Sequence, residues 1–314
     1  MKYLVTGSAG FVGSSLTESL LSDGHDVIGV DGHLGGLYGE AQKAERTERI
    51  LKTFPNFTFL QEDLRDFDYH KVLGDVQVVF NEAAMPGLGL SWTDFNLYNT
   101  CNVVVVNRLL EALRGFPNVH LVHASTSSVY GQFANGDEST PLKPYSPYGV
   151  TKLAAENLIS AYRQNFGLSA TVLRYFSIYG PNQRPDMAYS KFIQRLISGE
   201  DLDVYGDGLQ IRSNTFIGDI VGATRMAAQP IHDGEVLNIC GDQPISLLAA
   251  ISELADELGA IPKINFLPKV DGDQADTSGI NYRAKEILGW SPKTDIHLGL
   301  RLQAQAAVAG SSSS

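Results

Sequence analysis

The chain has 314 residues, enough for one large or two modest domains with a sizeable core. Its 24 Lys and Arg against 35 Asp and Glu give a net charge of −11. This balance argues against a general nucleic-acid or anionic-membrane surface, because such surfaces need an excess of basic side chains. An anionic ligand must therefore be met by local arginines, helix ends and backbone amides.

The two cysteines, Cys101 and Cys240, lie far apart without paired spacing, and no cluster of His and Cys predicts a metal site. The first residues, MKYLVTGSAG, run into a glycine turn without the apolar stretch of a signal peptide or membrane span. We expect a cytoplasmic protein with reduced cysteines, no metal, and no nucleic-acid or membrane partner.

Apolar runs bounded by turn residues recur as far as residue 176 and predict buried strands. They cover Tyr3–Thr6, Asp26–Asp31, Phe57–Gln61, Val76–Phe80, His120–Ala124 and Ala170–Arg174. Stretches with helical periodicity, such as Phe11–Ser22 and Asn102–Arg114, separate these runs. Such alternation predicts an α/β fold, a Rossmann-like doubly wound parallel sheet with helices on both faces.

The rhythm becomes irregular after residue 176, where prolines and glycines interrupt the chain. We expect residues 1–176 to form the sheet domain, to which the chain returns around residues 215–240. A smaller mixed α/β domain that covers the substrate is expected from residues 177–214 and 241–309. The serine-rich segment 310–314 is expected to be a flexible tail.

Three glycines, Gly7, Gly10 and Gly13, follow the first predicted strand and open the first predicted helix. Glycine at these positions allows a tight turn and lets backbone amides approach a pyrophosphate at the helix N-terminus. Asp31 ends the second predicted strand, where a carboxylate can bind both ribose hydroxyls and would repel a 2′-phosphate. This arrangement predicts that residues 1–176 bind NAD rather than NADP.

Further cofactor contacts are expected along the same edge of the sheet. Asp63, after the third predicted strand, could hydrogen-bond the adenine amino group or could equally be an ordinary turn aspartate. The other residues expected beside the cofactor are Phe11, Val12, Leu64, Ala83, Ala84, Ser125 and Tyr175.

Tyr148 and Lys152 lie four residues apart in SPYGVTK, on one face of a predicted helix. No other of the 13 tyrosines has a lysine at this offset. An ammonium favours the phenolate electrostatically, so we expect a lowered pKa for Tyr148 and a role as proton acceptor. Taken alone, the pair could also be an aromatic and a lysine on a solvated helix face.

The fifth predicted strand ends in HASTSSVYG, which leaves hydroxyl side chains at the ligand-binding edge. With Tyr148 and Lys152, this motif resembles the extended short-chain dehydrogenase/reductase superfamily, which includes the nucleotide-sugar epimerases and dehydratases. The resemblance implies that Thr126, Tyr148 and Lys152 are catalytic. It also implies that Lys152 holds the nicotinamide ribose and that Asn102 is the asparagine of the fourth helix.

The later segment RYFSIYGPNQRPDMA resembles the corresponding stretch of the UDP-glucuronate 4-epimerases, and VYGDGLQIR resembles the segment that grips their nucleotide. The resemblance implies that Arg184 and Arg212 neutralise a diphosphate, a role suited to guanidinium groups. Substrate contacts are expected from Pro86, Thr126, Ser127, Ser177, Arg184, Met187, Val204, Tyr205 and Arg212.

The activity that this resemblance implies is NAD-dependent inversion at carbon 4 of a UDP-sugar, UDP-glucuronate to UDP-galacturonate, through a transient 4-keto sugar. A homodimer is also implied. Because a 4-keto uronate can lose carbon dioxide, we expect Thr126, Ser127 and Ser177 to hold its carboxylate. A UDP-glucuronate decarboxylase, a UDP-galactose 4-epimerase, another nucleotide-sugar epimerase or dehydratase, and a non-catalytic NAD-binding protein remain alternatives.

The chain departs from its relatives in ways that leave the exact sugar and nucleotide base open. Relatives commonly have His-Leu-Ala-Ala after the fourth strand, where this chain has an asparagine and then Glu82. Strand alternation predicts that Glu82 points outward. Gly89, Ser213, Asn214 and Ile280 are further departures, and none of them removes a catalytic group.

Overall fold

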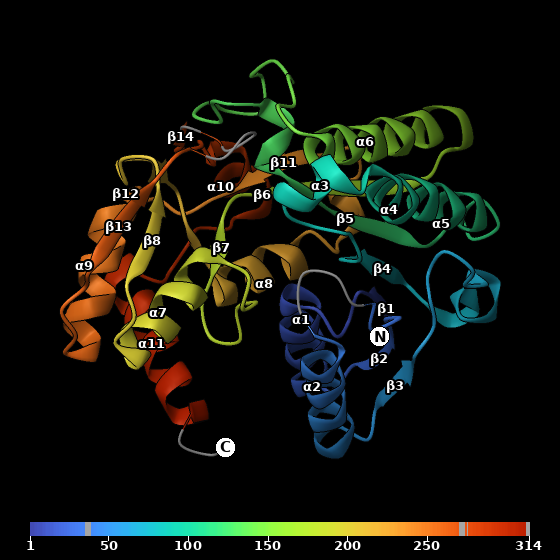
Figure 1. Cartoon of the computed structure of the whole chain (residues 1–314). Helices are drawn as coiled ribbons and strands as arrows, with labels where there is room; N and C mark the ends of the chain where they lie inside the picture. The colour runs from blue at the N-terminus through green and yellow to red at the C-terminus, as the bar shows by residue number, and fades with distance from the viewer. Residues whose placement is uncertain (35–38, 270–273, 275, 312–314) are drawn as a thin grey trace.

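The computed structural model describes residues 1–34, 39–269, 274 and 276–311. Within these residues the main sheet has seven strands in the order β11-β6-β5-β4-β1-β2-β3, and every neighbouring pair is parallel (Figure 1). The strands are β1 (Lys2–Thr6), β2 (Asp26–Val30), β3 (Phe57–Leu60), β4 (Val78–Asn81), β5 (His120–Thr126), β6 (Ser169–Tyr175) and β11 (Val236–Ile239).

Helices cover both faces of this sheet because successive strand residues point to opposite sides. Tyr3 and Val5 of β1 belong to the core under one set of helices, whereas Leu4 belongs to the core under the other. The first set is α1 (Phe11–Ser22), α2 (Glu40–Thr53), α8 (Ile217–Met226) and α10 (Tyr282–Leu288). The second set includes α5 (Val105–Leu113) and α6 (Pro147–Phe166). The predicted doubly wound α/β fold is confirmed.

The strand order reverses between β1 and β4, because β1 is followed by β2 on one side while β4 is followed by β5 on the other. In open parallel sheets a ligand binds beyond the carboxyl ends of the strands at such a reversal. Short elements occupy this edge: α3 (Gly89–Thr93), α4 (Phe95–Asn99), the π-helix η3 (Thr100–Val104) and the 3₁₀ turn η4 (Ser127–Tyr130).

A smaller lobe lies beside the sheet (Figure 1) and has its own apolar core, which includes Phe192, Leu254 and Leu300. Its helices are α7 (Ala188–Ser198), α9 (Leu247–Leu258) and α11 (Ile296–Ser311). Its short strands are β8 (Leu202–Tyr205), β9 (Ile211–Arg212), β12 (Ile245–Ser246), β13 (Ile264–Leu267) and β14 (Asp276–Thr277). The remaining elements are β7 (Ile178–Tyr179), β10 (Thr215–Phe216), η1 (Tyr69–Lys71), η2 (Leu73–Asp75) and η5 (Pro230–His232).

The last helix continues to Ser311, two residues into the segment expected to be a tail, and residues 312–314 lie outside the described part. Among the residues that the structure describes, none of the helices combines the length and apolarity that a membrane span requires. The same residues contain no group of three or more His, Cys, Asp or Glu side chains placed to hold a metal ion.

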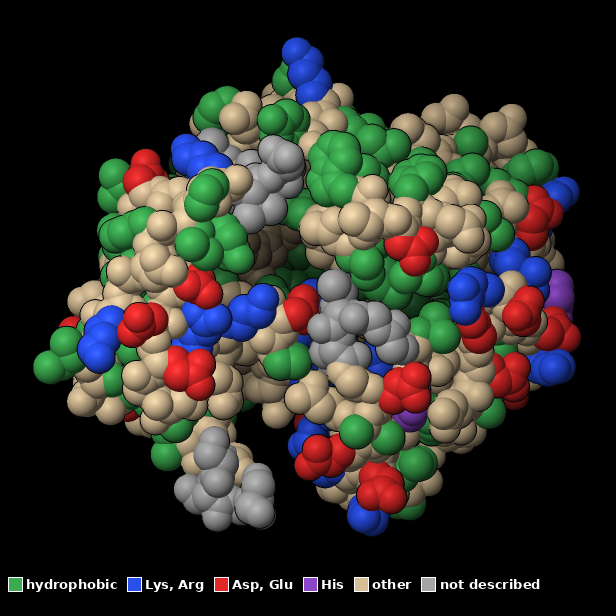
Figure 2. Space-filling model, in the orientation of Figure 1, with side chains coloured by type: hydrophobic (Ala, Val, Ile, Leu, Met, Phe, Trp, Pro, Cys, Tyr) green, Lys and Arg blue, Asp and Glu red, His purple; other side chains and the backbone are tan. Residues whose placement is uncertain are grey.

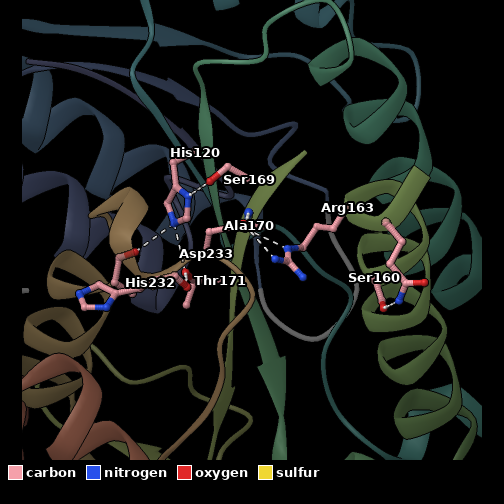
Figure 3. Close-up of polar contacts among 10 residues, drawn as sticks. His120, Ser160, Arg163, Ser169, Ala170, Thr171, His232 and Asp233 are labelled. Carbon is pink, nitrogen blue, oxygen red and sulfur yellow. Dashed lines mark hydrogen bonds and ion pairs between the residues drawn. The ribbon is translucent and has the colours of Figure 1, made fainter. Parts of the chain in front are cut away.

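A polar network joins strands at the amino edge of the sheet, the edge away from the reversal crevice (Figure 3). His120, the first residue of β5, is buried with its Nδ1 2.7 Å from the Ser169 hydroxyl. Its Nε2 lies 3.1 Å from the Thr171 hydroxyl and 3.2 Å from the Ala227 carbonyl. Burial lowers the pKa of His120. Because its hydrogen bonds are made within the fold, we assign this histidine a structural role.

Candidate active site

A cavity of about 790 Å³ lies between the main sheet and the smaller lobe, at the carboxyl edge of the sheet. Figure 2 shows the surface hollowed between the two lobes. The sequence-predicted residues that line the cavity are Gly7, Gly10, Phe11, Val12, Gly13, Asp31, Asp63, Leu64, Ala83, Ala84, Pro86, Ser125, Thr126, Ser127, Tyr148, Lys152, Tyr175, Ser177, Arg184, Met187 and Arg212. Residues as far apart in the sequence as Gly7 and Arg212 thus meet in one space.

The glycine turn is closed so tightly that side chains would not fit in it. Gly7 has φ of +69°, and a Cβ there would lie 2.8 Å from the Cα of Ala83. A Cβ on Gly13 would lie 2.1 Å from the carbonyl oxygen of Gly7. Helix α1 begins directly after Gly10, at Phe11, so its first amides point toward the cavity edge. This backbone cradle fits a pyrophosphate, as a dinucleotide cofactor requires.

Asp31 follows β2 and is held by two backbone amides. Its carboxylate accepts hydrogen bonds from the amides of His33 at 2.7 Å and Ala9 at 3.3 Å. Lys43 lies 3.8 Å from the same carboxylate. Because a carboxylate has about four acceptor sites, this oriented group could still bind ribose hydroxyls.

Asp63 is engaged by Arg65 two residues later. The guanidinium Nε of Arg65 donates to both carboxylate oxygens, at 3.0 and 2.9 Å, and this pairing holds the pKa of Asp63 below its usual value. Arg65 also lines the cavity. The proposed contact of Asp63 with adenine stays a prediction.

Tyr148 and Thr126 come together at the carboxyl end of β5. The Thr126 hydroxyl lies close enough to the Tyr148 phenol to act on its pKa, and α6, which begins at Pro147 behind the N-cap Ser146, places the ring there. Burial raises the pKa of Tyr148, while the Thr126 hydroxyl and the charge of Arg184 lower it. The expected lowered pKa is therefore wrong for the protein alone, because desolvation of the phenolate outweighs its favourable neighbours.

Lys152 lies one turn further along α6, and its side chain is 2 % exposed. Its Nζ donates to the carbonyl oxygen of Ala124 at 2.6 Å. Burial lowers the pKa of Lys152 to about 8, although the charges of Glu82 and Glu156 oppose this shift. The Lys152 ammonium group therefore lines the same cavity as Tyr148.

A buried ion pair lies beside the carboxyl end of β5. The Glu156 carboxylate on α6 accepts from the Arg174 guanidinium at 2.7 Å and from the Ser125 hydroxyl. Arg174 also donates to the Tyr130 hydroxyl at 2.8 Å. Breaking such a pair leaves an uncompensated buried charge, so this network fixes β5 and α6 relative to each other. Ser125 serves that network as well as lining the cavity.

The two predicted diphosphate arginines reach the cavity from its other side. Arg184 is paired with Asp186, at 2.9 Å from Nε and 2.6 Å from Nη2. Arg212 on β9 donates to the carbonyl oxygen of Gln274 at 2.6 Å. Both guanidinium groups are thus oriented at the cavity wall by neighbours that sequence spacing did not single out.

Three predicted site residues lie off the cavity. Asn102, in the π-helix, is buried, and its amide accepts from the Met85 amide at 2.7 Å and donates to the Met85 carbonyl at 3.0 Å. It therefore holds a cavity-lining backbone segment and does not face the ligand space. Val204 is fully buried in the core of the smaller lobe, and Tyr205 beside it is half exposed. Neither residue lines the cavity, since β8 pairs with β13 in the smaller lobe, and their predicted contact with the substrate stays a prediction.

Several lining residues were not expected from the sequence. Glu82 does not point outward, because its Oε1 accepts a hydrogen bond from the Tyr175 hydroxyl at 3.0 Å in the cavity wall. Gln274 donates to the carbonyl of Gly131 at 2.7 Å, and no sequence pattern marks it. Lys191 lines the cavity four residues after Met187, a helical spacing that could have indicated it.

The departures Gly89, Ser213, Asn214 and Ile280 do not disrupt the site. Gly89 lines the cavity, and a Cβ at this position would meet nothing within 4 Å. Asn214 is buried and donates to the Tyr189 hydroxyl at 2.8 Å. Ser213 is buried, whereas Ile280 is 37 % exposed. The wall beside Gly89 thus has room for a larger side chain.

The chain combines a doubly wound parallel sheet and a closed glycine turn with a threonine, a tyrosine and a lysine in one cavity. This combination defines a protein of the short-chain dehydrogenase/reductase type. The sequence pattern described as the NAD dependent epimerase/dehydratase family matches residues 3–240. The chain belongs to this family.

Relatives cover nearly the whole chain. YtcB of Bacillus subtilis, named as an uncharacterized UDP-glucose epimerase, is 40% identical over 96% of each chain. The UDP-glucuronate 4-epimerase of Thermodesulfobacterium geofontis is 35% identical over 95% of this chain and 94% of its own. The crystal structure of UDP-glucuronic acid 4-epimerase from Bacillus cereus, in complex with UDP-glucuronic acid and NAD, superimposes with a TM-score of 0.94. It is 38% identical over 98% of this chain and 99% of its own.

Proposed function

We propose that the protein is an NAD-dependent 4-epimerase of UDP-sugars, acting on UDP-glucuronate to give UDP-galacturonate. One observation carries this proposal. The neighbouring Thr126 and Tyr148 open into the same cavity as the glycine turn and Arg184. A proton acceptor, a pyrophosphate cradle and a cation for a diphosphate are thus available to one bound pair of cofactor and sugar nucleotide.

Each residue has a role in the proposed reaction. NAD, when bound, supplies the chemistry of accepting hydride from carbon 4 of the sugar and returning it. Tyr148 accepts the proton of the 4-hydroxyl as the ketone forms, and it gives a proton back to the ketone oxygen after the sugar has turned. Thr126, whose hydroxyl acts on the pKa of the phenol, orients Tyr148 for the proton transfer. The charge of Arg184 offsets part of the desolvation of the phenolate, and Lys152 adds positive charge beside the reacting oxygen once the substrate is bound.

The cofactor residues fall into three groups in this proposal. The glycine turn and the start of α1 bind the pyrophosphate, and Asp31 binds the adenosine ribose. Lys152 holds the nicotinamide ribose. Asp63 remains the candidate for the adenine amino group, sharing its carboxylate with Arg65. In the same way, Arg184 and Arg212 bind the diphosphate of the sugar nucleotide.

The boundaries 1–176 with a return around 215–240, and 177–214 with 241–309, remain our proposed division into NAD-binding and substrate domains. The pairing of β11 with β6 supports the return. The separate apolar core around Phe192 and Leu254 supports the substrate domain.

The proposed activity is tested by incubating the purified protein with UDP-glucuronate or UDP-glucose and following the products by NMR. We expect UDP-galacturonate from the first. If only UDP-glucose is converted, to UDP-galactose, the substrate is a neutral sugar nucleotide, as the name of the Bacillus subtilis relative suggests. A UDP-pentose would indicate a decarboxylase. No product from either substrate, with NAD bound, would indicate a non-catalytic binding protein.

The sugar carboxylate is proposed to be held by Thr126, Ser127 and Ser177, which line the cavity. When the carboxylate is held, the bond that joins it to the sugar ring stays out of line with the π system of the 4-keto group. The keto sugar therefore does not lose carbon dioxide. We expect the double variant Ser127→Ala and Ser177→Ala to form more UDP-pentose or to lose uronate binding. Product ratios by NMR check this result, with the exposed Ser160→Ala as control. Unchanged kinetics in the double variant would refute the assignment.

We also propose a homodimer formed through one helical surface. Exposed apolar side chains gather on neighbouring elements, namely Trp92 on α3, Phe95 on α4, Val104 on η3 and Val150 on α6. Figure 2 shows apolar side chains gathered in the region of α3 and α4. Apolar patches of this kind mark association surfaces. Light scattering should give twice the chain mass of 34.1 kDa, and the mass of a single chain would contradict the proposal.

We place the protein in the cytoplasm, because Cys101 and Cys240 are both buried and unbridged, as expected in a reducing compartment. Detection in the cytosolic fraction of fractionated cells checks this placement, and recovery from an extracytoplasmic fraction would contradict it.

A further inference from the structure

Glu82 is an acidic residue in the cavity wall to which the proposed reaction gives no role. It directly follows β4, so it lies at the carboxyl edge of the sheet between the glycine turn and the catalytic helix α6. The backbone of Glu82 packs against the glycine turn, because a Cβ on Gly7 would be 3.0 Å from the carbonyl carbon of Glu82.

The surroundings of Glu82 hold its carboxylate in the cavity. From β6, the Tyr175 hydroxyl donates to its Oε1 at 3.0 Å. That hydroxyl is also 2.7 Å from the Thr224 hydroxyl on α8, so Tyr175 is itself fixed. Helix α6 contributes Lys152, whose charge interacts with Glu82. Tyr175 and Lys152 are the titratable neighbours that act on this carboxyl among the described residues.

The charge of Glu82 changes close to neutral pH. Burial raises the pKa of its carboxyl to about 7, while the hydrogen bond from Tyr175 and the charge of Lys152 lower it. The pKa of Tyr175 is well above its usual value because of burial and the neighbouring Glu82. Tyr175 therefore remains a neutral donor when Glu82 ionises.

We propose that Glu82 is a positioning residue that sets the oxidation state preferred by the bound cofactor. Its carboxylate favours the cationic, oxidised nicotinamide over the neutral, reduced ring, and protonation removes that preference. The inference rests on the proposed placement of the nicotinamide beside Tyr148 and Lys152. Glu82 forms no bond to the ring and exchanges no electrons with it. The hydride comes from carbon 4 of the sugar, and any proton that Glu82 gains comes from solvent.

Electrostatics gives the direction of the effect. A carboxylate and a cation attract each other more strongly in a partly buried cavity than in water, and the attraction disappears when the ring is reduced to its neutral form. Favouring the oxidised form pulls hydride back toward the keto sugar, and thus shortens the time during which that ketone could escape or lose carbon dioxide. A carboxylate at this position therefore suits an enzyme that regenerates its own cofactor.

The test measures the ratio of the affinities for NADH and NAD directly. The protein as purified with NAD is mixed with NADH at pH values from about 6 to about 9, and the exchange is followed by the fluorescence of bound NADH. Because one unit of pKa difference corresponds to a tenfold change in affinity, we expect the preference for NAD over NADH to rise by about tenfold with increasing pH. Glu82→Gln should leave only the part of the rise that loss of the Lys152 charge contributes, and the exposed Glu200→Gln should keep the full rise of the parent.

The sign follows from the protonation states. Below the pKa of Glu82 the carboxyl is neutral and discriminates little between NAD and NADH. Above that pKa the carboxylate stabilises the cationic, oxidised ring. Lys152, with a pKa of about 8, titrates in the same range, and the comparison with Glu82→Gln separates the two groups. Glu82→Leu is a second variant that removes the charge without leaving an amide in the cavity.

Each outcome distinguishes this inference from the proposed function. A rise that is clearly smaller in both Glu82 variants than in the parent supports the role of Glu82. Equal profiles in the parent and both variants overturn it, even if epimerisation is found. A parent protein that binds neither NAD nor NADH overturns the cofactor site itself.

Discussion

Replacement of Tyr148 by phenylalanine is expected to lower the turnover of UDP-glucuronate by about 10² to 10⁴, the usual contribution of a positioned acid–base group. The variant loses only the phenolic oxygen, so the ring stays between α6 and its neighbour Tyr98. NAD binding should persist, because the pyrophosphate cradle and Lys152 are unchanged. The measurements are initial rates by NMR and the NAD content of the purified protein.

The matched control for this variant is Tyr145→Phe, which removes the hydroxyl of a tyrosine that is 52% exposed and lies off the cavity. Its turnover should equal that of the parent. A Tyr148→Phe protein that is as fast as the parent would show that another group accepts the proton. In that case the closeness of Tyr148 and Thr126 would be structural only.

Substitution of Gly13 by alanine is expected to abolish the retention of NAD. The added Cβ would lie 2.1 Å from the carbonyl oxygen of Gly7, far closer than real atoms approach. Relief requires α1 to move away from the turn, and that movement opens the pyrophosphate cradle. We also expect a loss of about 1–3 kcal/mol in the free energy of unfolding, as for other overpacked sites.

Gly74→Ala is the control for this substitution, because a Cβ at Gly74 would meet nothing within 4 Å and the residue, in η2, does not line the cavity. The NAD content after purification and urea unfolding curves measure the two effects. Full NAD content in the Gly13→Ala protein would mean that the turn can widen without losing the cofactor. The assignment of the cradle would then need revision.

The sheet and its glycine turn could be predicted from the sequence because each depends on local chemistry. The apolar run at Phe57 and the glycine triplet are contiguous, so periodicity and spacing are enough to indicate them. The structure changed their limits only slightly. β5, for example, extends to Thr126, two residues beyond the expected end, which makes the proposed catalytic threonine the last residue of the strand.

The pKa of Tyr148 could not be predicted from the spacing to Lys152. Four residues on a helix place the two side chains on one face, but they do not reveal how strongly each is desolvated. In the fold both side chains enter the cavity wall. Burial therefore raises the pKa of Tyr148 and lowers that of Lys152 to about 8. The net direction is a property of the assembled site.

Val204 and Tyr205 illustrate the limits of transferring a motif. The segment VYGDGLQIR resembles the nucleotide-binding segment of relatives, yet only Arg212 of the three predicted residues lines the cavity. Pairing of β8 with β13 decides which side chains are buried between elements. That pairing joins segments about sixty positions apart, which local sequence cannot specify.

The sequence by itself determined the fold class and the glycine turn, because these follow from apolar periodicity and a short motif. Its resemblance to a known superfamily added the prediction that Thr126, Tyr148 and Lys152 are catalytic. Only the tertiary structure decided that Glu82 faces Tyr175. The same holds for the hydrogen bond of Asn102 with the Met85 backbone and for the orientation of Arg184 by Asp186. The physical reason is that orientation, burial and charge pairing arise between elements. They are set when the sheet, helices and smaller lobe close around one cavity.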